Sequence, residues 1–327
     1  MKALQLKAYG EINESLIFNE IPKPNMGPND VMIEVKAAAI NPIDKSIILG
    51  NLQSLLPIPL PCTLAYDVSG TVVEKGNDVG NFEIGDLVHS RVPQEQMGTL
   101  AEYVAVTNSA VSKKPGNVSF EEAASIPLAG LTAMQSLEYA QLKENDRILI
   151  HAGSGGVGSL AIQYAKSKGA FVYTTTSTAN VEWVKALGAD RVIDYKTEDY
   201  KTIANDVDIV FDTLGKAYTT ESFEVVKPGG KVVSIVGPLD EESAQMFGMT
   251  DYKLSDEIAT LSREKNAAYK FIFMHPNGAH LEIIKALIED EKMKPIIDKV
   301  YPFEEAIEAF KHLASGRAKG KIVIKIN

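Results

Sequence analysis

A glycine-rich turn between an apolar run and an amphipathic segment constrains the fold of this chain more than any other feature. Residues 147–152 read Arg-Ile-Leu-Ile-His-Ala, which is typical of a strand buried on both faces of a parallel sheet. Residues 153–158, the glycine turn, fit G-x-G-x-x-G, and apolar residues at helical spacing follow them. Glycines there permit a tight turn, close approach to a pyrophosphate and close helix–strand packing, so the order predicts a dinucleotide site. The residues expected at the phosphates are Ser154, Gly155, Gly156 and Val157.

Strand and helix candidates alternate after this turn. Apolar and β-branched runs predict strands at 147–152, 171–175, 191–193, 207–211, 231–236 and 270–274. Helical patterns fall between them, around 157–168, 180–187, 197–205, 218–226 and 255–264. Alternation with crossovers long enough to hold a helix is typical of a parallel, doubly wound sheet, and six strands complete a dinucleotide-binding fold.

The two ends of the chain have a different pattern. Up to about Lys114, short runs with β-branched or alternating apolar residues are separated by turns such as 76–80, which indicates a β-rich unit. A helix is expected from Ser119, whose hydroxyl would cap a first turn that carries acidic residues. After Pro276 the sequence predicts two amphipathic helices and a closing strand at 320–326, which we expect to return to the β-rich unit.

Charge and cysteine content argue against several classes of protein. The formal net charge is −10, whereas a general nucleic-acid or anionic-membrane surface needs clustered positive charge. No apolar run approaches the length of a membrane span, and the N-terminus lacks a signal-peptide pattern. The single cysteine, Cys62, excludes an internal disulfide framework and any site with several thiolates. We therefore expect a cytoplasmic protein.

Motifs along the whole chain resemble one family. They are AAINPID at 38–44, AGLTA at 129–133, HAGSGGVG at 151–158, LGADRVIDY at 187–195, MHPNG at 274–278 and GKIV at 320–323. With the order of the units, they are similar to the medium-chain dehydrogenase/reductase superfamily, in its zinc-independent branch of NADPH:quinone and enone (2-alkenal) reductases. The resemblance implies an α/β fold with two domains and a homodimer. A GroES-like β-rich catalytic domain would occupy 1–124 and 275–327, and a Rossmann domain with a doubly wound parallel six-stranded sheet would occupy 125–274.

The same resemblance implies that the chain holds no zinc. Zinc-dependent relatives carry a cysteine where this chain has Asn41, a histidine at Tyr66 and a third ligand near Leu128. None of these side chains supplies a thiolate or an imidazole. The closely spaced cysteines of a structural zinc lobe are also missing, because Cys62 is the only cysteine. No metal-ligating residue is therefore predicted.

The end of the second Rossmann strand bears on the choice of nucleotide. A site for NAD normally places an acid about 20 residues after the glycine turn, where it binds the ribose 2′-hydroxyl. Residues 173–180 read Tyr-Thr-Thr-Thr-Ser-Thr-Ala-Asn, with no acid before Glu182. By resemblance, Ser177 and Tyr195 hold the 2′-phosphate of NADPH, whereas Asn180 stands where the family usually has a lysine. We expect NADPH, although the hydroxyl run fits a strand end of good β-propensity equally well.

Three side chains are candidates for contact with the substrate or the nicotinamide. Reduction of a quinone or a polarised C=C bond needs hydride delivered at close range and support for the developing oxyanion. The Asn41 amide can donate to a substrate carbonyl, and Tyr66 can donate to substrate oxygen or form an aromatic wall. By resemblance, Thr132 lies near the nicotinamide ribose or carboxamide. Each has a structural alternative: an Asn-Pro turn for Asn41, plain packing for Tyr66 and a backbone hydrogen bond for Thr132.

Four further residues complete the expected cofactor site. Val236 and Gly237 follow the fifth Rossmann strand and should lie beside the nicotinamide or its ribose. Phe273, on the last predicted strand, is expected near the carboxamide, and plain core packing explains it equally well. Lys321 resembles the lysine of a family Gly-Lys pair near the cofactor phosphates, with a surface lysine on a strand as the alternative.

These observations lead to one main hypothesis and to one from a different class. The first is a zinc-independent, NADPH-dependent reductase that transfers hydride to quinones or α,β-unsaturated carbonyls. The alternative is an NADPH-binding structural or regulatory protein with little turnover, which resemblance to the lens crystallins of this branch brings into consideration. The glycine turn supports cofactor binding in both cases and does not separate them.

Overall fold

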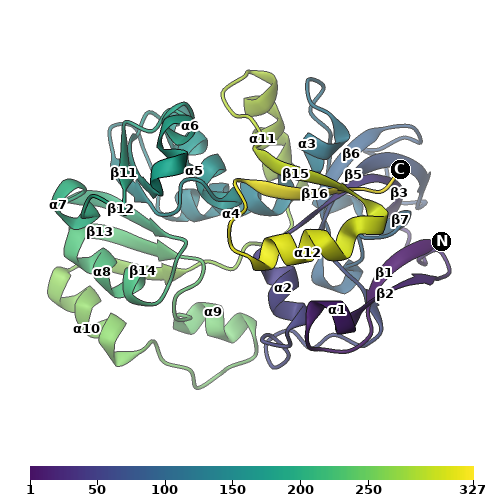
Figure 1. The fold of residues 1–327 in the computed structure, drawn as a ribbon, viewed down its shortest axis with the longest axis horizontal. Coiled ribbons are helices and arrows are strands. Elements are labelled where there is room, and N and C mark those ends of the chain that lie inside the picture. The colour runs from purple at the N-terminus through teal and green to yellow at the C-terminus, as the bar shows by residue number, and fades with distance from the viewer. The chain divides into compact units, whose positions relative to one another are not determined.

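The chain forms two compact units, shown in Figure 1. The computed structural model describes every residue from Met1 to Asn327. Unit 1 contains Met1–Leu131, His275–Glu291 and Pro295–Asn327, and unit 2 contains Thr132–Met274 with Lys292–Lys294.

The boundary between the units differs from the predicted one. It falls after Leu131 instead of after residue 124, because the first turn of helix α4 (Pro127–Tyr139) is bound to unit 1. The Leu128 N–H donates there to Asp67 at 2.7 Å. The short segment Lys292–Lys294 joins unit 2, since the Lys294 backbone exchanges hydrogen bonds of 2.9 and 3.0 Å with the Gln163 side chain.

Unit 1 is built around a seven-stranded sheet in the order β15-β16-β3-β5-β6-β8, with β7 paired to β3. A smaller sheet has the order β2-β1-β4. The closing strand β16 pairs antiparallel with β3, Ile322 opposite Ile40, which confirms the predicted return to the β-rich unit. The strands are β1 (Lys2–Leu6), β2 (Leu16–Glu20), β3 (Asp30–Ile40), β4 (Cys62–Thr63), β5 (Asp67–Lys75), β6 (Leu87–Arg91), β7 (Tyr103–Thr107), β8 (Val111–Lys113), β15 (Ile297–Pro302) and β16 (Lys321–Lys325).

The helices of unit 1 begin where local chemistry favours them. Ser119 and Glu122 form a reciprocal cap at the start of α3, as the sequence predicts. Helix α2, which the sequence analysis did not predict, begins at Asn41-Pro42, where proline suits the first helical turn. Helix α12 packs against α2 and β16. The helices are α1 (Ile12–Ser15), α2 (Pro42–Ile48), α3 (Phe120–Ala124), α11 (Gly278–Glu289) and α12 (Ala306–Ala314), with the start of α4.

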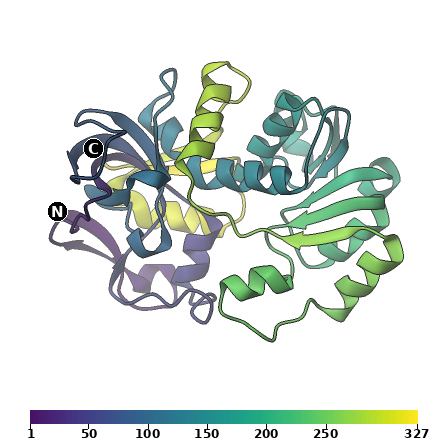
Figure 2. The same cartoon turned by 180° about the vertical axis from the view of Figure 1, so that it is seen from behind.

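Unit 2 contains a six-stranded, fully parallel sheet in the order β11-β10-β9-β12-β13-β14. This confirms the predicted doubly wound sheet, which Figure 2 shows from the opposite side to Figure 1. The strands are β9 (Arg147–Ile150), β10 (Phe171–Thr176), β11 (Arg191–Asp194), β12 (Val207–Asp212), β13 (Val226–Ser234) and β14 (Ala268–Phe271). The helices are α5 (Gly156–Ser167), α6 (Val181–Lys185), α7 (Tyr200–Ile203), α8 (Ala217–Val225), α9 (Glu241–Met246) and α10 (Asp256–Lys265).

The last strand of this sheet begins and ends earlier than its predicted bounds of 270–274. β14 ends at Phe271, so Phe273 follows the strand instead of lying within it. Asp240, the first of three consecutive acidic residues, is buried. Its carboxylate caps α9 and accepts from the Phe271 N–H at 2.8 Å and from the Lys270 ammonium at 3.1 Å. An inward-facing lysine needs a counter-charge, and Asp240 supplies it.

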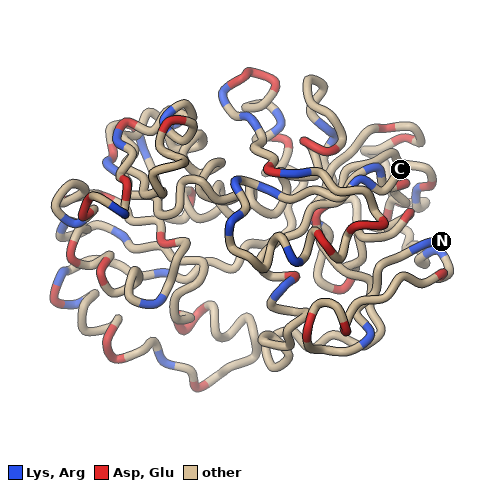
Figure 3. Tube along the Cα trace, in the orientation of Figure 1, with Lys and Arg blue, Asp and Glu red and all other residues tan.

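Basic and acidic residues are interspersed along both units, as Figure 3 shows. No helix has the length and the apolar content that crossing a bilayer requires.

Candidate active site

The carboxyl edge of the sheet in unit 2 collects most of the predicted cofactor residues. Its strand ends are nearly level, since Asp212 pairs with Ser234, and Ser234 with Phe271. The strand order reverses between β9 and β12, which is where doubly wound sheets bind ligands. The predicted residues that directly follow these strand ends are Ser154, Gly155, Gly156, Val157, Ser177, Tyr195, Val236 and Gly237.

The glycine turn packs α5 onto the sheet with no room for a side chain at Gly153 or Gly158. A Cβ atom at Gly158 would stand 2.3 Å from the Ala152 carbonyl oxygen, and one at Gly153 would stand 2.2 Å from Thr174 Oγ1. Gly155 is the N-cap of α5, and no side chain caps the helix. The N–H groups of its first turn therefore need an external acceptor. The phosphates of a dinucleotide fit this arrangement.

A buried carboxylate that the sequence analysis missed holds the neighbouring loops. Asp212, at the end of β12, is 0% exposed, and its Oδ1 accepts two backbone N–H groups of the following turn at 2.9 and 2.8 Å. Its Oδ2 accepts the hydroxyls of Thr219 at 2.6 Å and Ser234 at 2.9 Å. The Ser234 oxygen in turn accepts the Gly237 N–H at 2.8 Å. The only sequence feature that could have indicated this network is that each of two apolar strands ends in a polar residue, Asp212 and Ser234.

A neutral amide, that of Asn180, is bonded to Ser177 at the end of β10. The Asn180 amide donates to Ser177 Oγ at 3.1 Å and accepts from the Trp183 indole N–H at 3.0 Å. Because the Ser177 oxygen already accepts a hydrogen bond, its own proton is left for an anionic acceptor. Tyr195, which follows β11, is 54% exposed. Arg191, at the start of β11, is paired with Glu198, so its charge is already compensated.

His151 and Thr175 pack beneath the glycine turn and do not face solvent. Thr175 Oγ1 accepts from the Ala152 N–H at 3.2 Å and lies 3.2 Å from His151 Nδ1. The His151 ring meets Tyr200 edge-on, with ring centroids 4.9 Å apart. Burial lowers the pKa of His151 to about 4, so the ring is neutral at physiological pH. These two side chains shape the turn from below.

In unit 1 the structure brings together Asn41, Asp67 and Lys321, which we call the Asn41 cluster. The Lys321 ammonium donates to Asn41 Oδ1, to the Ile40 carbonyl at 3.2 Å and to Asp67 Oδ2 at 3.2 Å. The Asn41 amide nitrogen donates to the same Asp67 oxygen at 2.9 Å. Asp67 Oδ1 accepts the Leu128 N–H. No sequence pattern pointed to Asp67, and the alternative of a surface position for Lys321 is wrong, because that side chain is only 6% exposed.

Tyr66 lies inside unit 1, directly before Asp67. It is 0% exposed, and its hydroxyl donates to Gln94 Oε1. The Arg91 guanidinium lies 4.5 Å from the centre of the Tyr66 ring. Burial, followed by the nearby Asp44 carboxyl, raises the pKa of the Tyr66 phenol, so its hydroxyl stays protonated.

Asp44 lies beneath the backbone of Asn41. Its Oδ2 accepts the Asn41 N–H at 2.7 Å, which closes the first turn of α2, and its Oδ1 is buried without a partner. Burial raises the pKa of Asp44 to about 7.

The residues at the expected zinc-ligand positions do not fit a metal. The Asn41 amide is turned toward Asp67 and Lys321, the Tyr66 hydroxyl toward Gln94, and Leu128 has no donor atom in its side chain. No three His, Cys, Asp or Glu side chains come close enough together to bind an ion. The donor chemistry for tetrahedral zinc is therefore not built here.

Two predicted cofactor residues remain, Thr132 and Phe273. Thr132 is the first residue of unit 2 and is buried within α4. Phe273 packs edge-on against Phe247, with ring centroids 5.0 Å apart. The cofactor contacts expected of both residues stay predictions.

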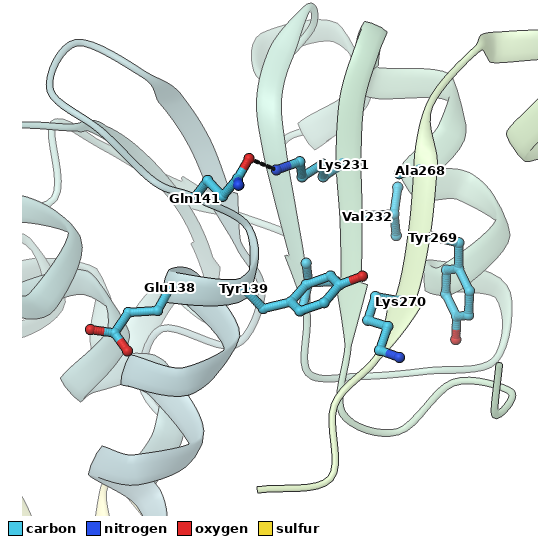
Figure 4. A pocket seen from close by; sticks show the side chains of 9 residues that line it. Glu138, Tyr139, Gln141, Lys231, Val232, Ala268, Tyr269 and Lys270 are labelled. Carbon is cyan, nitrogen blue, oxygen red and sulfur yellow. Dashed lines mark hydrogen bonds between the residues drawn. The ribbon is translucent and has the colours of Figure 1, made fainter. Parts of the chain in front are cut away.

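A pocket of about 420 Å³ lies in unit 2 beside the edge strand β14. Figure 4 shows the Tyr139 ring extending toward Lys270, and Lys231 bonded to Gln141. No predicted site residue lines this pocket. The lining residues are Glu138, Tyr139, Gln141, Lys231, Val232, Val233, Ala268, Tyr269 and Lys270.

The β-rich unit with its Asn41 cluster and the parallel sheet with its uncapped glycine turn define a two-unit, dinucleotide-dependent oxidoreductase. A family model described as "Alcohol dehydrogenase GroES-like domain" matches residues 27–116, and one described as "Zinc-binding dehydrogenase" matches residues 187–324. The chain belongs to the medium-chain dehydrogenase/reductase family, in its branch of quinone and enone reductases.

Three relatives illustrate this membership. A 2-methylene-furan-3-one reductase from Solanum lycopersicum is 35% identical over 334 residues, which cover 99% of this chain and 79% of that protein. A chloroplastic NADPH-dependent alkenal/one oxidoreductase from Arabidopsis thaliana is 33% identical over 334 residues, with the same coverage of 99% and 79%. The solved structure of a quinone oxidoreductase from Coxiella burnetii superposes with a TM-score of 0.88 at 34% identity, over 100% of this chain and 99% of that one.

Proposed function

We propose that this protein is a zinc-independent reductase that uses NADPH to reduce quinones or α,β-unsaturated carbonyl compounds. The observation that carries the proposal is the carboxyl edge of unit 2, where the uncapped start of α5 and the loops held by Asp212 and Ser234 form a site for a dinucleotide. The substrate class is supported by the relatives, whose names state the reduction of alkenals and enones, a furanone and quinones.

The cofactor roles follow the order of the strands. The glycine turn takes the pyrophosphate, the end of β10 takes the 2′-phosphate, and the loop after β13 takes the nicotinamide half. The proposed contacts are Ser154, Gly155, Gly156 and Val157 for the pyrophosphate, Ser177 and Tyr195 for the 2′-phosphate, and Thr132, Val236, Gly237 and Phe273 for the nicotinamide half.

The chemistry of the proposal needs few groups from the protein. When bound, NADPH supplies the hydride. One amide hydrogen of Asn41 is used by Asp67, and we assign the second to the substrate oxygen on which negative charge develops. We assign Tyr66 a supporting part within unit 1, because it is buried and its hydroxyl is already bonded to Gln94. Water supplies the proton.

The direct test is turnover of NADPH, followed at its absorbance band, with 1,4-naphthoquinone and but-3-en-2-one as acceptors and NADH as the control cofactor. We expect reduction of at least one acceptor, with NADPH preferred. Replacement of Asn41 by alanine should lower kcat by about tenfold to a hundredfold, as expected for loss of an oxyanion donor. Tight NADPH binding with no turnover of either acceptor would contradict the proposal and favour the structural or regulatory alternative.

We also propose that the protein is a homodimer, joined through β14. This strand ends the six-stranded sheet, so its outer side has no neighbouring strand, and only its last residue, Phe271, has its N–H and carbonyl bonded there, to Asp240 and Ser243. Such an edge pairs readily with another strand, and a second copy would also cover the pocket beside it. Light scattering during gel filtration tests this directly: a mass of 35.5 kDa, that of one chain, would refute it.

A cytoplasmic location is a further part of the proposal, supported by the free thiol of Cys62. Fractionation of the source cells tests it, and recovery of the protein in an organelle fraction would refute it.

A further inference from the structure

The Lys321 ammonium has no hydrogen to spare for a ligand. An ammonium group carries three N–H donors, and three acceptors surround it: the Ile40 carbonyl, Asn41 Oδ1 and Asp67 Oδ2. The side chains of Lys321 and Asp67 are 6% and 0% exposed. This geometry does not suit the contact with a cofactor phosphate that the sequence suggested for Lys321.

The Lys321–Asp67 pair allows only one orientation of the Asn41 amide. In that orientation the amide oxygen faces the ammonium and the amide nitrogen faces the carboxylate. A flipped amide would turn its NH₂ group toward the ammonium and its oxygen toward the carboxylate. Both hydrogen bonds would be lost, and each partially charged end of the amide would face a group of the same sign. The direction of the second Asn41 N–H is therefore decided by the ion pair.

The ammonium also changes the strength of that N–H as a donor. A cation bonded to the oxygen of an amide withdraws electron density through the amide, and at low local dielectric this strengthens hydrogen bonds from its nitrogen. Asp44 and Arg91 also interact electrostatically with Asp67, and Tyr66 precedes it in the chain; in the hydrogen bonds that they make, none of the three contacts the Asn41 side chain. Lys321 is thus the cation in direct contact with the Asn41 amide.

We propose that Lys321 is a positioning residue for the reduction: its buried ammonium, paired with Asp67, orients the Asn41 amide and polarises it toward the substrate oxygen. A positive charge then lies among the positions where zinc-dependent relatives are expected to hold their metal, and a side chain of the protein supplies it. The inference rests on the proposed role of Asn41 in the reduction.

The test compares variants that remove the charge in different ways. Lys321→Met alone leaves the buried Asp67 carboxylate unpaired, which is strongly destabilising, so the principal variant is the double replacement Lys321→Met with Asp67→Asn. Lys321→Arg keeps a cation. We expect the double variant to lose about tenfold in kcat, while its Kd for NADPH, measured by calorimetry, stays within about twofold of the parent value. Lys321→Arg should retain more kcat than the double variant.

A second, more exposed ion pair serves as the control for general loss of an ion pair, with side chains 32% and 28% exposed. Lys166 and Asp190 form a 2.8 Å pair in unit 2, near the amino ends of β10 and β11. The double replacement Lys166→Met with Asp190→Asn should leave kcat unchanged.

The double replacement Lys321→Met with Asp67→Asn, made in an Asn41→Ala background, tests whether Lys321 acts through Asn41. We expect it to cost little further kcat there, because the amide through which the ammonium acts is gone. An undiminished loss in that background would overturn the inference, as would a rise in the Kd for NADPH with kcat unchanged, which would instead support a phosphate contact. Failure of the parent protein to reduce either acceptor would refute the proposed function itself. A lower kcat in Asn41→Ala but not in Lys321→Met with Asp67→Asn would refute only the role of Lys321.

Discussion

The Ser234 hydroxyl donates to the Asp212 carboxylate at 2.9 Å, and its oxygen accepts the Gly237 N–H at 2.8 Å. Asp212 and Ser234 end adjacent parallel strands and lie directly opposite each other in the register. A buried carboxylate thus fixes a hydroxyl, which in turn fixes the loop assigned to the nicotinamide half of the cofactor.

Replacement of Ser234 by alanine should therefore weaken NADPH binding. Loss of the hydroxyl frees the Gly237 N–H and removes one donor from Asp212, and a hydrogen bond of this kind is worth about 1 to 2 kcal/mol. We expect the Kd for NADPH to rise by about tenfold, as measured by isothermal titration calorimetry. Thr219→Val is the matched control, because Thr219 donates to the same carboxylate at 2.6 Å without bonding the loop. An equal rise of the Kd for NADPH in both variants would show that NADPH binding depends on the donors to Asp212 and not on the bond from Ser234 to the loop.

A lysine at position 180 should strengthen the preference for NADPH. Asn180 donates to Ser177 and accepts from Trp183, so the proposed 2′-phosphate site has hydroxyl and amide donors without a bonded cation. Asn180→Lys should lower the Kd for NADPH by about tenfold, and Asn180→Asp should raise it by a similar factor through repulsion of the phosphate. The Kd for NADH, which lacks the 2′-phosphate, serves as the control and should change little. A parallel change in both constants would place the 2′-phosphate elsewhere.

Removal of metal ions should leave the protein unaffected. The Asn41, Tyr66 and Leu128 side chains at the expected ligand positions cannot form a zinc site. Dialysis against EDTA should therefore change neither NADPH turnover nor the melting temperature. Stoichiometric zinc in the purified protein, with loss of activity on chelation, would contradict this assignment.

The stability of unit 1 should fall as the pH rises from about 4 to about 7. Burial raises the pKa of Asp44 from 3.8 to about 7, so the folded protein keeps a proton that the unfolded chain loses within this window. The free energy of unfolding then decreases with pH by as much as about 4 kcal/mol, and the loss is complete above the folded pKa.

Asp44→Asn removes this titration and can still accept the Asn41 N–H. Relative to the parent, the variant should become more stable as the pH increases from 4.5 to 8, as measured by urea unfolding. The exposed Asp251→Asn serves as the control and should show no such trend. A constant difference between parent and Asp44→Asn at all pH values would mean that Asp44 does not hold its proton in the folded state.

The fold of unit 2 was predictable because its signals are local. Each strand is an apolar run, each crossover is long enough for a helix, and the glycine turn marks the junction of strand and helix. Boundaries were harder where a tertiary contact decided them. β14 ends at Phe271, before Phe273, and the Phe271 N–H at that end donates to the buried Asp240 carboxylate, a contact that no local pattern announces.

The sequence by itself determined the class of this protein: a glycine turn between a buried strand and a helix, followed by strand and helix segments that alternate. These features depend on residues that are close in the chain, where periodicity and residue type suffice. Only the tertiary structure decided how Asn41, Asp67 and Lys321 act together, because Lys321 follows Asn41 by 280 residues and meets it only when β16 pairs with β3. Burial then sets which hydrogen bonds those groups must make, since a charge removed from water has to find its partners within the protein.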